Sequence, residues 1–82
     1  MKENLSLYHI FYIVGKTGNI SRAAKELYIS QPAVSRAVQK LESNLSVPLF
    51  KRNSRGVALT PEGEILFQKI EKAFSLVSEG EE

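Results

Sequence analysis

"ISQPAVSRAVQKLE", residues 29–42, carries a helix start signal followed by two chemically different faces. Ser30 is the expected N-cap, accepting a hydrogen bond from the N–H of Ala33, and Pro32 falls at the second helical position, where its missing N–H costs nothing. The apolar residues that follow share one side of a helical wheel and form the expected core face: Val34, Val38, Leu41 and Leu45. We therefore expect a helix over about residues 31–44.

The opposite face of this helix is short, polar and free of acidic residues before Glu42. It presents amides, hydroxyls, small apolar groups and cations at Gln31, Pro32, Ala33, Ser35, Arg36, Gln39, Lys40 and Ser43. Gln can pair bidentately with adenine, Ser can bond to several base edges, Ala and Pro can touch a thymine methyl group, and Arg and Lys neutralise phosphates. A solvent-exposed face without a partner more often mixes Glu with Lys four residues apart. The composition favours DNA recognition over that alternative.

A second, short helix is expected just before this one. Ser21 is its expected N-cap, it should run to about Tyr28, and its small buried side consists of Ala23, Ala24 and Leu27. Only about three residues separate the two helices, which is the connection expected of a helix-turn-helix pair. Ser21 and Arg22 are also candidates for phosphate contacts, with capping as the alternative role of Ser21.

Upstream, residues 5–16 repeat apolar side chains at helical spacing, at Leu7, Ile10, Phe11 and Val14. Gly18 follows, where a left-handed residue commonly ends a helix, so we expect a first helix here. His9, the only histidine, lies in its middle without Cys, Asp or another His at ligand spacing, and no metal or cofactor is expected. The sequence also lacks a paired-carboxylate cleft and a Gly-rich phosphate loop, so we do not expect an enzyme.

After Pro48 the pattern changes to two short runs, residues 49–52 and 57–60, separated by Asn53, Ser54, Arg55 and Gly56. These four residues suit a hairpin loop. A hairpin after a recognition helix is a wing, and Lys51, Arg52 and Arg55 would place three cations on it, at a minor groove or the DNA backbone. The alternative is a hairpin whose cations only maintain solubility and prevent edge pairing.

The sequence ends in a further expected helix. Thr60, Pro61 and Glu62 form a strong helix start, and the helix should run to about Ser78. Its apolar positions form a broad stripe: Leu66, Phe67, Ile70, Ala73, Phe74 and Val77. We interpret part of this stripe as packing on the first helix and part as a dimer interface, with a wholly intramolecular role as the alternative.

Charge divides the chain into two unlike parts. Residues 1–60 carry nine Lys and Arg against three Glu, a balance of +6, and residues 61–82 carry two Lys against six Glu, a balance of −4. The first part suits a polyanion and the second would avoid one. The 82 residues are 43% hydrophobic and contain no cysteine. With no stretch long and apolar enough to span a bilayer and no disulfide framework, we expect a protein of the cytoplasm.

Residues 21–63, "SRAAKELYISQPAVSRAVQKLESNLSVPLFKRNSRGVALTPEG", resemble the amino-terminal DNA-binding domain of LysR-type transcriptional regulators. The matching residues are Ala23, Ala24, Leu27, Ser30, Gln31, Pro32, Ala33, Ser35, Leu41, Glu42, Leu45, Leu49, Phe50, Arg52, Leu59, Thr60 and Gly63. The resemblance implies a mainly α fold: a winged helix-turn-helix of three helices and a two-stranded wing over residues 1–60, then a linker and dimerisation helix over residues 61–82. It also implies a carboxy-terminal effector-binding domain, absent from this chain, through which a small-molecule effector would act.

The resemblance also implies a role for individual residues. It places Gln31, Pro32, Ala33 and Ser35 at base edges in the major groove, Arg36 and Lys40 at phosphates, and Arg52 and Arg55 on the wing, although Arg52 could instead support the hairpin through an ion pair. A homodimer would bind double-stranded DNA at a two-fold symmetric operator. The alternative is a winged helix that associates with other proteins, its basic face being incidental. Ser46 replaces the Gly usual after the recognition helix, and a left-handed Ser would cost about 1 kcal/mol.

Overall fold

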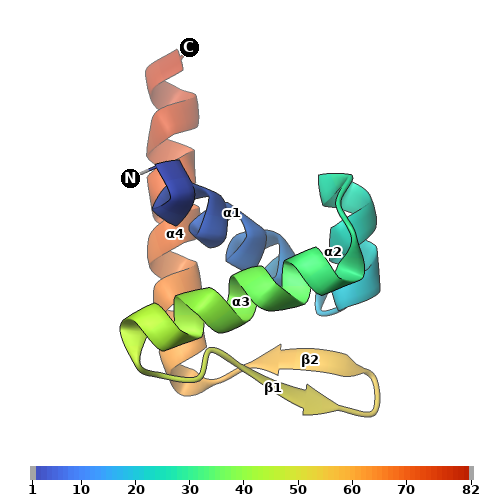
Figure 1. Cartoon of the computed structure of the whole chain (residues 1–82). Coiled ribbons are helices and arrows are strands. Elements are labelled where there is room, and N and C mark those ends of the chain that lie inside the picture. The colour runs from blue at the N-terminus through green and yellow to red at the C-terminus, as the bar shows by residue number, and fades with distance from the viewer. Residues whose placement is uncertain (1, 82) are drawn as a thin grey trace.

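The chain forms four helices and a two-stranded antiparallel sheet in the computed structural model, which describes the backbone of residues 2–81 and the side chains of residues 6–76. In chain order the elements are α1 Lys2–Thr17, α2 Ile20–Leu27, α3 Gln31–Leu45, β1 Phe50–Asn53, β2 Gly56–Leu59 and α4 Pro61–Glu81. Figure 1 shows the hairpin running below α3, α2 at one end of α3, and α4 standing upright at the other end. The predicted mainly α winged helix-turn-helix architecture is confirmed.

The core is built around α1, whose Phe11 and Val14 are fully buried. Two groups of buried residues pack against it. The first combines Leu7 and Phe11 of α1 with Leu41 of α3, Leu49 of the α3–β1 connection and Ile70 of α4. The second combines Val14 of α1 with Ala23 and Ala24 of α2 and Val34 and Val38 of α3. The helix-turn-helix pair is thus fixed to α1 by small and branched apolar side chains.

The predicted core face of α3 is confirmed for three of its four residues. Val34, Val38 and Leu41 are buried, but Leu45 is 39% exposed. The prediction was wrong for Leu45 because this residue lies one turn beyond Leu41, at the end of α3 and outside both buried groups. A helical pattern identifies one face of a helix, whereas burial also depends on how far the neighbouring elements reach.

The junction between α1 and α2 corrects the predicted cap. Gly18 has a φ of +70°, as expected for a residue that ends a helix. The N-cap of α2 is Asn19, not Ser21: its extended backbone directs its Oδ1 toward the N–H of Arg22, which donates to it at 2.9 Å. Ser21 lies inside the helix, because α2 begins at Ile20. The hydroxyl of Ser21 is therefore not used for capping.

The start of α3 is as predicted, and its end adopts the left-handed conformation that is costly for Ser46. The Ala33 N–H donates to the Ser30 Oγ at 3.2 Å, which confirms the predicted N-cap, and Pro32 lies in the first turn. At the other end, Ser46 has a φ of 59° and its backbone N–H donates to the carbonyls of Glu42 and Ser43. The left-handed conformation usual for Gly is therefore kept at this position despite the Ser side chain.

The loop that connects the two strands of the wing is shorter than predicted. Asn53 pairs with Gly56, so that only two residues, Ser54 and Arg55, connect the strands instead of the expected four. The Arg55 N–H donates to the Asn53 Oδ1 at 2.8 Å, which closes the turn. Gly56 has a φ of +139° and lies so close to the carbonyl of Gly18 that a Cβ would collide with it. This close approach places the turn end of the wing against the α1–α2 junction.

α4 begins with the predicted capping signal. The Thr60 Oγ1 accepts from the Gly63 N–H at 3.0 Å and donates to the Pro48 carbonyl at 2.7 Å. A Cβ at Gly63 would collide with the Leu49 carbonyl, so the first turn of α4 packs directly on the chain that leads into the wing. The helix continues to Glu81, and its end rises beyond the rest of the fold (Figure 1). None of the helices in the described part of the chain is long and apolar enough to cross a bilayer.

Candidate nucleic-acid interface

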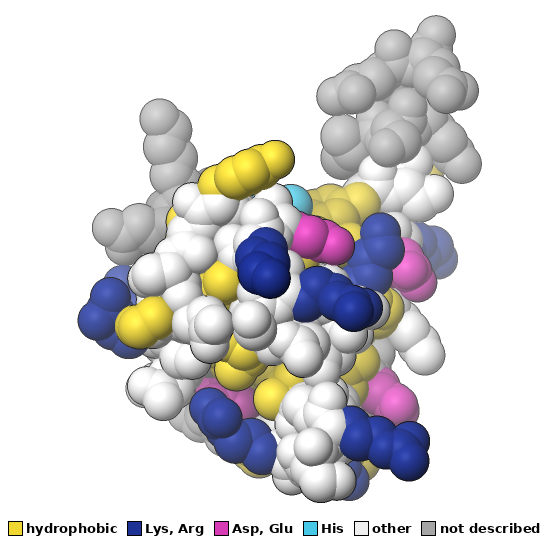
Figure 2. Space-filling view, turned by 90° about the vertical axis from the view of Figure 1, so that its right-hand side faces the viewer, with side chains coloured by type: hydrophobic (Ala, Val, Ile, Leu, Met, Phe, Trp, Pro, Cys, Tyr) yellow, Lys and Arg dark blue, Asp and Glu magenta, His cyan; other side chains and the backbone are white. Residues whose placement is uncertain are grey.

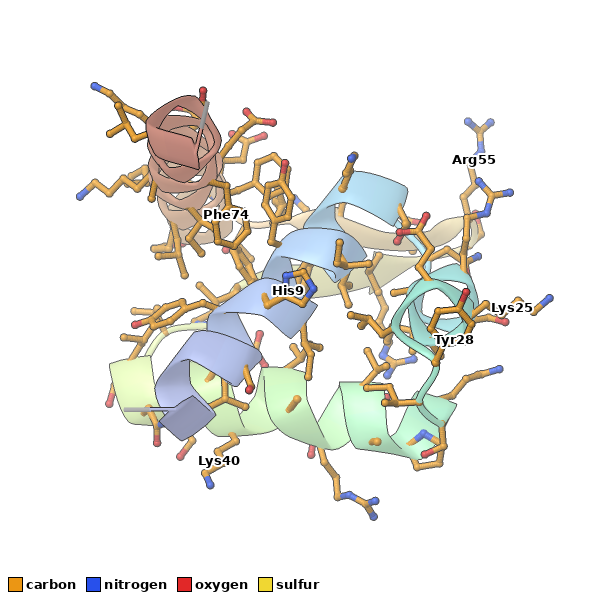
Figure 3. All side chains as sticks on the ribbon, turned by 90° about the horizontal axis from the view of Figure 1, so that it is seen from above. His9, Lys25, Tyr28, Lys40, Arg55 and Phe74 are labelled. Atoms are coloured by element: carbon orange, nitrogen blue, oxygen red, sulfur yellow. The ribbon has the colours of Figure 1, made fainter. Side chains whose placement is uncertain are left out.

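The helix-turn-helix pair is closed by a short turn over residues 28–30. Tyr28 is left-handed, with a φ of 58°, and its N–H donates to the carbonyls of Ala24 and Lys25. The Ile29 N–H donates to the Ala24 carbonyl at 3.1 Å. Since the last carbonyls of α2 are used in this way, the chain turns within three residues and α3 starts beside α2. The ring of Tyr28 is 94% exposed and points away from the core (Figure 3).

The four predicted base-contacting residues lie together in the first turns of α3. Gln31 and Pro32 are exposed, whereas Ala33 and Ser35 are half-buried. The side chain of Gln31 is not free: its Nε2 donates to the Oγ of Ser21 on α2 at 3.2 Å. The structure thus joins a predicted base contact to a predicted phosphate contact, a link that sequence spacing alone did not indicate.

The predicted phosphate-contacting cations are exposed. Arg22 lies on α2, and Arg36 and Lys40 lie one turn apart on α3. Lys40 points away from α1, on the outer side of α3 (Figure 3). These cations flank the residues predicted to read base edges, which is the arrangement in which phosphate contacts fix the position of a recognition helix.

The three predicted cations of the wing are exposed to solvent. Lys51, Arg52 and Arg55 are all exposed, and Arg55 lies at the tip of the hairpin. A cleft of about 120 Å³ separates the wing from α3, and its lining includes Ser35, Gln39 and Arg52. Arg52, the carboxylate of Glu42 and two neutral hydrogen-bonding side chains therefore border the same space between α3 and β1.

The end of the molecule formed by α2 and the tip of the wing is predominantly basic. Figure 2 views this end, and dark-blue Lys and Arg side chains are spread over it with few magenta carboxylates among them. Five of the nine acidic residues of the sequence lie on α4. The fold thus converts a charge difference along the chain into a charge difference across the molecule, which favours approach of a polyanion from the basic side.

Comparison with known proteins identifies this arrangement. A family described as "Bacterial regulatory helix-turn-helix protein, lysR family" matches residues 5–64. The chain belongs to the LysR family. It is 43% identical over 79 residues to the HTH-type transcriptional regulator PerR of Escherichia coli K12, which covers 96% of this chain and 27% of PerR. It is 40% identical over 76 residues to the HTH-type transcriptional regulator GltR of Bacillus subtilis, covering 93% of this chain and 26% of GltR. The chain thus spans about a quarter of the length of these relatives.

Solved LysR structures show the same fold. The BenM DBD in complex with catB site 1 DNA superposes with a TM-score of 0.84 at 37% identity, over 92% of this chain and 84% of that one. The CbnR DBD in complex with DNA superposes with a TM-score of 0.81 at 33% identity, over 92% of this chain and 86% of that one. The predicted LysR-type helix-turn-helix DNA-binding domain is thereby confirmed.

One residue that supports the LysR interface was missed as a functional candidate. The Oε2 of Glu42, on the last turns of α3, accepts from the backbone N–H groups of Leu49 at 2.7 Å and Phe50 at 3.2 Å. This carboxylate ties the recognition helix to the first residues of the wing. The available signal was an isolated acid at the end of an otherwise acid-free face, but nothing in the sequence indicates that the chain returns to it seven residues later.

The residues of the predicted dimer stripe in this LysR domain differ in how deeply they are buried. Ile70 belongs to the intramolecular core, Leu66 and Phe67 are half-buried, and Ala73 and Phe74 are exposed. The side chain of Val77 lies outside the described residues. Phe67 and Phe74 pack on the Tyr12 ring with centroid distances of 5.0 and 5.1 Å. An apolar groove of about 280 Å³ runs between α1 and α4, lined by Tyr8, Leu66, Lys69, Ile70, Ala73 and Phe74.

Proposed function

We propose that this LysR-type domain binds specific sites on double-stranded DNA by placing the first turns of α3 in the major groove. The observation that carries the proposal is the acid-free flank of α3, where exposed Gln31 and Pro32 are followed by exposed Arg36. Amide, hydroxyl and small apolar groups read base edges, and the cations beside them hold the phosphates that border the groove. The similarity to the BenM and CbnR DBD complexes with DNA supports the same function here.

Within this proposal, the predicted residues form three groups according to the part of the DNA that they contact. Gln31, Pro32, Ala33 and Ser35 contact base edges, and Ser21, Arg22, Arg36 and Lys40 contact phosphates. Lys51, Arg52 and Arg55 contact the adjacent minor groove or backbone from the wing. The wing is held to the body at its base by Glu42 and near its tip by the contact of Gly56 with Gly18. An Arg at a hairpin tip suits a narrow minor groove because the negative potential is strongest there.

The domain acts as a homodimer in this proposal, with α4 as the linker and dimerisation helix. Two members of the predicted stripe, Ala73 and Phe74, are exposed beside the groove between α1 and α4, and Phe74 is 37% exposed. Exposed apolar side chains of this size on one helix favour burial against a second copy. A two-fold dimer would read two half-sites, so the operator would be two-fold symmetric. A small-molecule effector would act through a region of the full-length regulator outside these residues, in the cytoplasm.

Selection of bound sites from random duplex DNA tests this function directly. We expect the wild-type chain to enrich sites with two-fold symmetry, and Gln31→Ala to lose the preference at one base pair of each half-site. If the wild-type chain protected no duplex DNA from cleavage in a footprinting experiment at low salt, the proposal would be refuted. If the chain bound no DNA and instead bound another protein with an affinity independent of salt concentration, the alternative of a protein-association module would be supported.

Sedimentation equilibrium tests the dimer. Phe74→Glu should shift the chain toward the monomer, because a carboxylate cannot be buried unpaired in an apolar interface. The matched control is Leu45→Glu, which changes an apolar side chain of nearly equal exposure, 39% against 37%, on α3 instead of α4. Equal dimerisation of both variants and the wild type would exclude this face of α4 as the interface.

A further inference from the structure

The hydroxyl of Ser21 is available for a role other than capping. Asn19 caps α2, and Ser21 lies in the first turn of that helix, half-buried. Its Oγ lies 3.2 Å from the Nε2 of Gln31, ten residues later and on the other helix of the pair. This is a direct side-chain link between α2 and the residue at the start of α3 that is predicted to read a base.

We propose that Ser21 is a positioning residue that fixes the orientation of the Gln31 amide for base readout. The proposal rests on the proposed function, because it requires α3 to enter the major groove. Gln31 is exposed and has three rotatable side-chain torsions, whereas Ser21 has one and is held by a regular helix. A short side chain on a rigid element therefore restrains a long one, which lowers the conformational entropy that is lost when DNA binds.

The direction of the hydrogen bond determines which groups remain for the base. One of the two Nε2 protons is donated to Ser21, so the other proton and the Oε1 acceptor stay available. That pair is complementary to adenine, whose N7 accepts and whose N6 amino group donates in the major groove. We therefore expect the base pair read by Gln31 to contain adenine.

The same geometry leaves a role for the Ser21 proton. Because the Oγ accepts from Gln31, the hydroxyl hydrogen can still be donated outward, to a phosphate oxygen. Ser21 would then join a phosphate contact to a base contact. Phosphate contacts carry no sequence information by themselves, but one that also orients a reading side chain contributes to specificity.

Site selection with three variants tests the proposal. The base pair read by Gln31 is first identified as the one whose preference is lost in Gln31→Ala. At that base pair, Ser21→Ala should reduce the preference about 3- to 10-fold, the effect of losing one hydrogen bond, and leave the preferences at the other positions unchanged. Loss of the phosphate contact should lower the affinity for all DNA equally and therefore should not alter these relative preferences. Ser21→Thr keeps the hydroxyl and should restore the preference. Ser75→Ala, an exposed serine within α4, is the matched control and should have no effect.

Three outcomes of these experiments would overturn the positioning role of Ser21. Full preference retained in Ser21→Ala, or no restoration by Ser21→Thr, would overturn the positioning role while leaving DNA binding intact. A uniform loss on all DNA together with a lower melting temperature would also overturn it, since that would make Ser21 a purely structural residue. A wild-type chain with no preferred site would refute the proposed function and this inference together. In a double-mutant comparison, Ser21→Ala should add no further loss of preference to Gln31→Ala.

Discussion

The carboxylate of Glu42 accepts a hydrogen bond of 2.7 Å from the backbone N–H of Leu49, which joins the end of the recognition helix to the start of the wing. The same oxygen also accepts from Phe50. Two N–H groups at the entry to an edge strand are thereby satisfied by one charged acceptor. The relative placement of the two proposed DNA-contacting elements therefore depends on a half-buried side chain that lines the cleft between them.

Replacement of this carboxylate should loosen the wing. We expect Glu42→Ala to lower the free energy of unfolding by about 2 kcal/mol, because two partly buried N–H groups lose a charged acceptor. Urea denaturation measures the change. Glu26→Ala, which removes an exposed carboxylate from α2, is the matched control. Equal stability of the two variants would show that the contacts of Glu42 contribute nothing.

The N-cap of α3 gives a second stability prediction. Ser30→Ala removes the acceptor of the Ala33 N–H and should cost about 1 kcal/mol in thermal or denaturant unfolding. Ser43→Ala, at an exposed position inside the same helix, should be neutral or slightly stabilising, since Ala is the better helix former. An unchanged melting temperature for Ser30→Ala would contradict the capping role.

Replacement of the left-handed serine after α3 should stabilise the fold. Ser46 has a φ of 59°, which a residue without a Cβ adopts freely, so Ser46→Gly should raise the free energy of unfolding by about 0.5–1 kcal/mol. The opposite sign is expected for Ser43→Gly, which places the same residue inside the helix. A loss of stability in Ser46→Gly would mean that the Ser side chain contributes more than its backbone strain costs.

The salt dependence of DNA binding tests the cations of α3. If each protomer of a dimer neutralises about four phosphates, log affinity should fall with log salt concentration at a slope of roughly −7. Arg36→Ala removes one such contact per protomer and should make the slope less negative by about 2. Lys69→Ala, on the acidic α4, removes an equal charge and should leave the slope unchanged. A slope near zero for the wild type would argue against phosphate contacts altogether.

Gln31 should affect specificity more than overall affinity. We expect Gln31→Ala to lose about 1–3 kcal/mol per half-site on the preferred operator and almost nothing on random DNA. Titration of both DNAs at one salt concentration measures the difference. An equal loss on the two DNAs would show that Gln31 holds the phosphate backbone and reads no base.

Most of the fold and many of the proposed contact residues followed from local chemistry. The start of α3 at Ser30 and Pro32 and the start of α4 at Thr60 depend on which residues can satisfy or omit the first N–H groups of a helix. Such signals act over three or four residues, so the sequence carries them in full. The prediction of Ser21 as the cap of α2 was wrong because Asn19, two residues earlier, is also a good capping residue type, and only backbone geometry distinguishes them.

The sequence by itself determined the helices, the hairpin and the chemistry of the exposed flank of α3, because each depends on neighbours close in the chain. The tertiary structure alone decided which distant groups meet: Gln31 with Ser21, Glu42 with Leu49, and Gly56 with Gly18. It also decided that Leu45 is exposed and Ile70 buried, although both continue an apolar stripe. The reason is physical: burial and long-range hydrogen bonds depend on where packed elements end and which backbones approach each other, and no pattern within one helix records either.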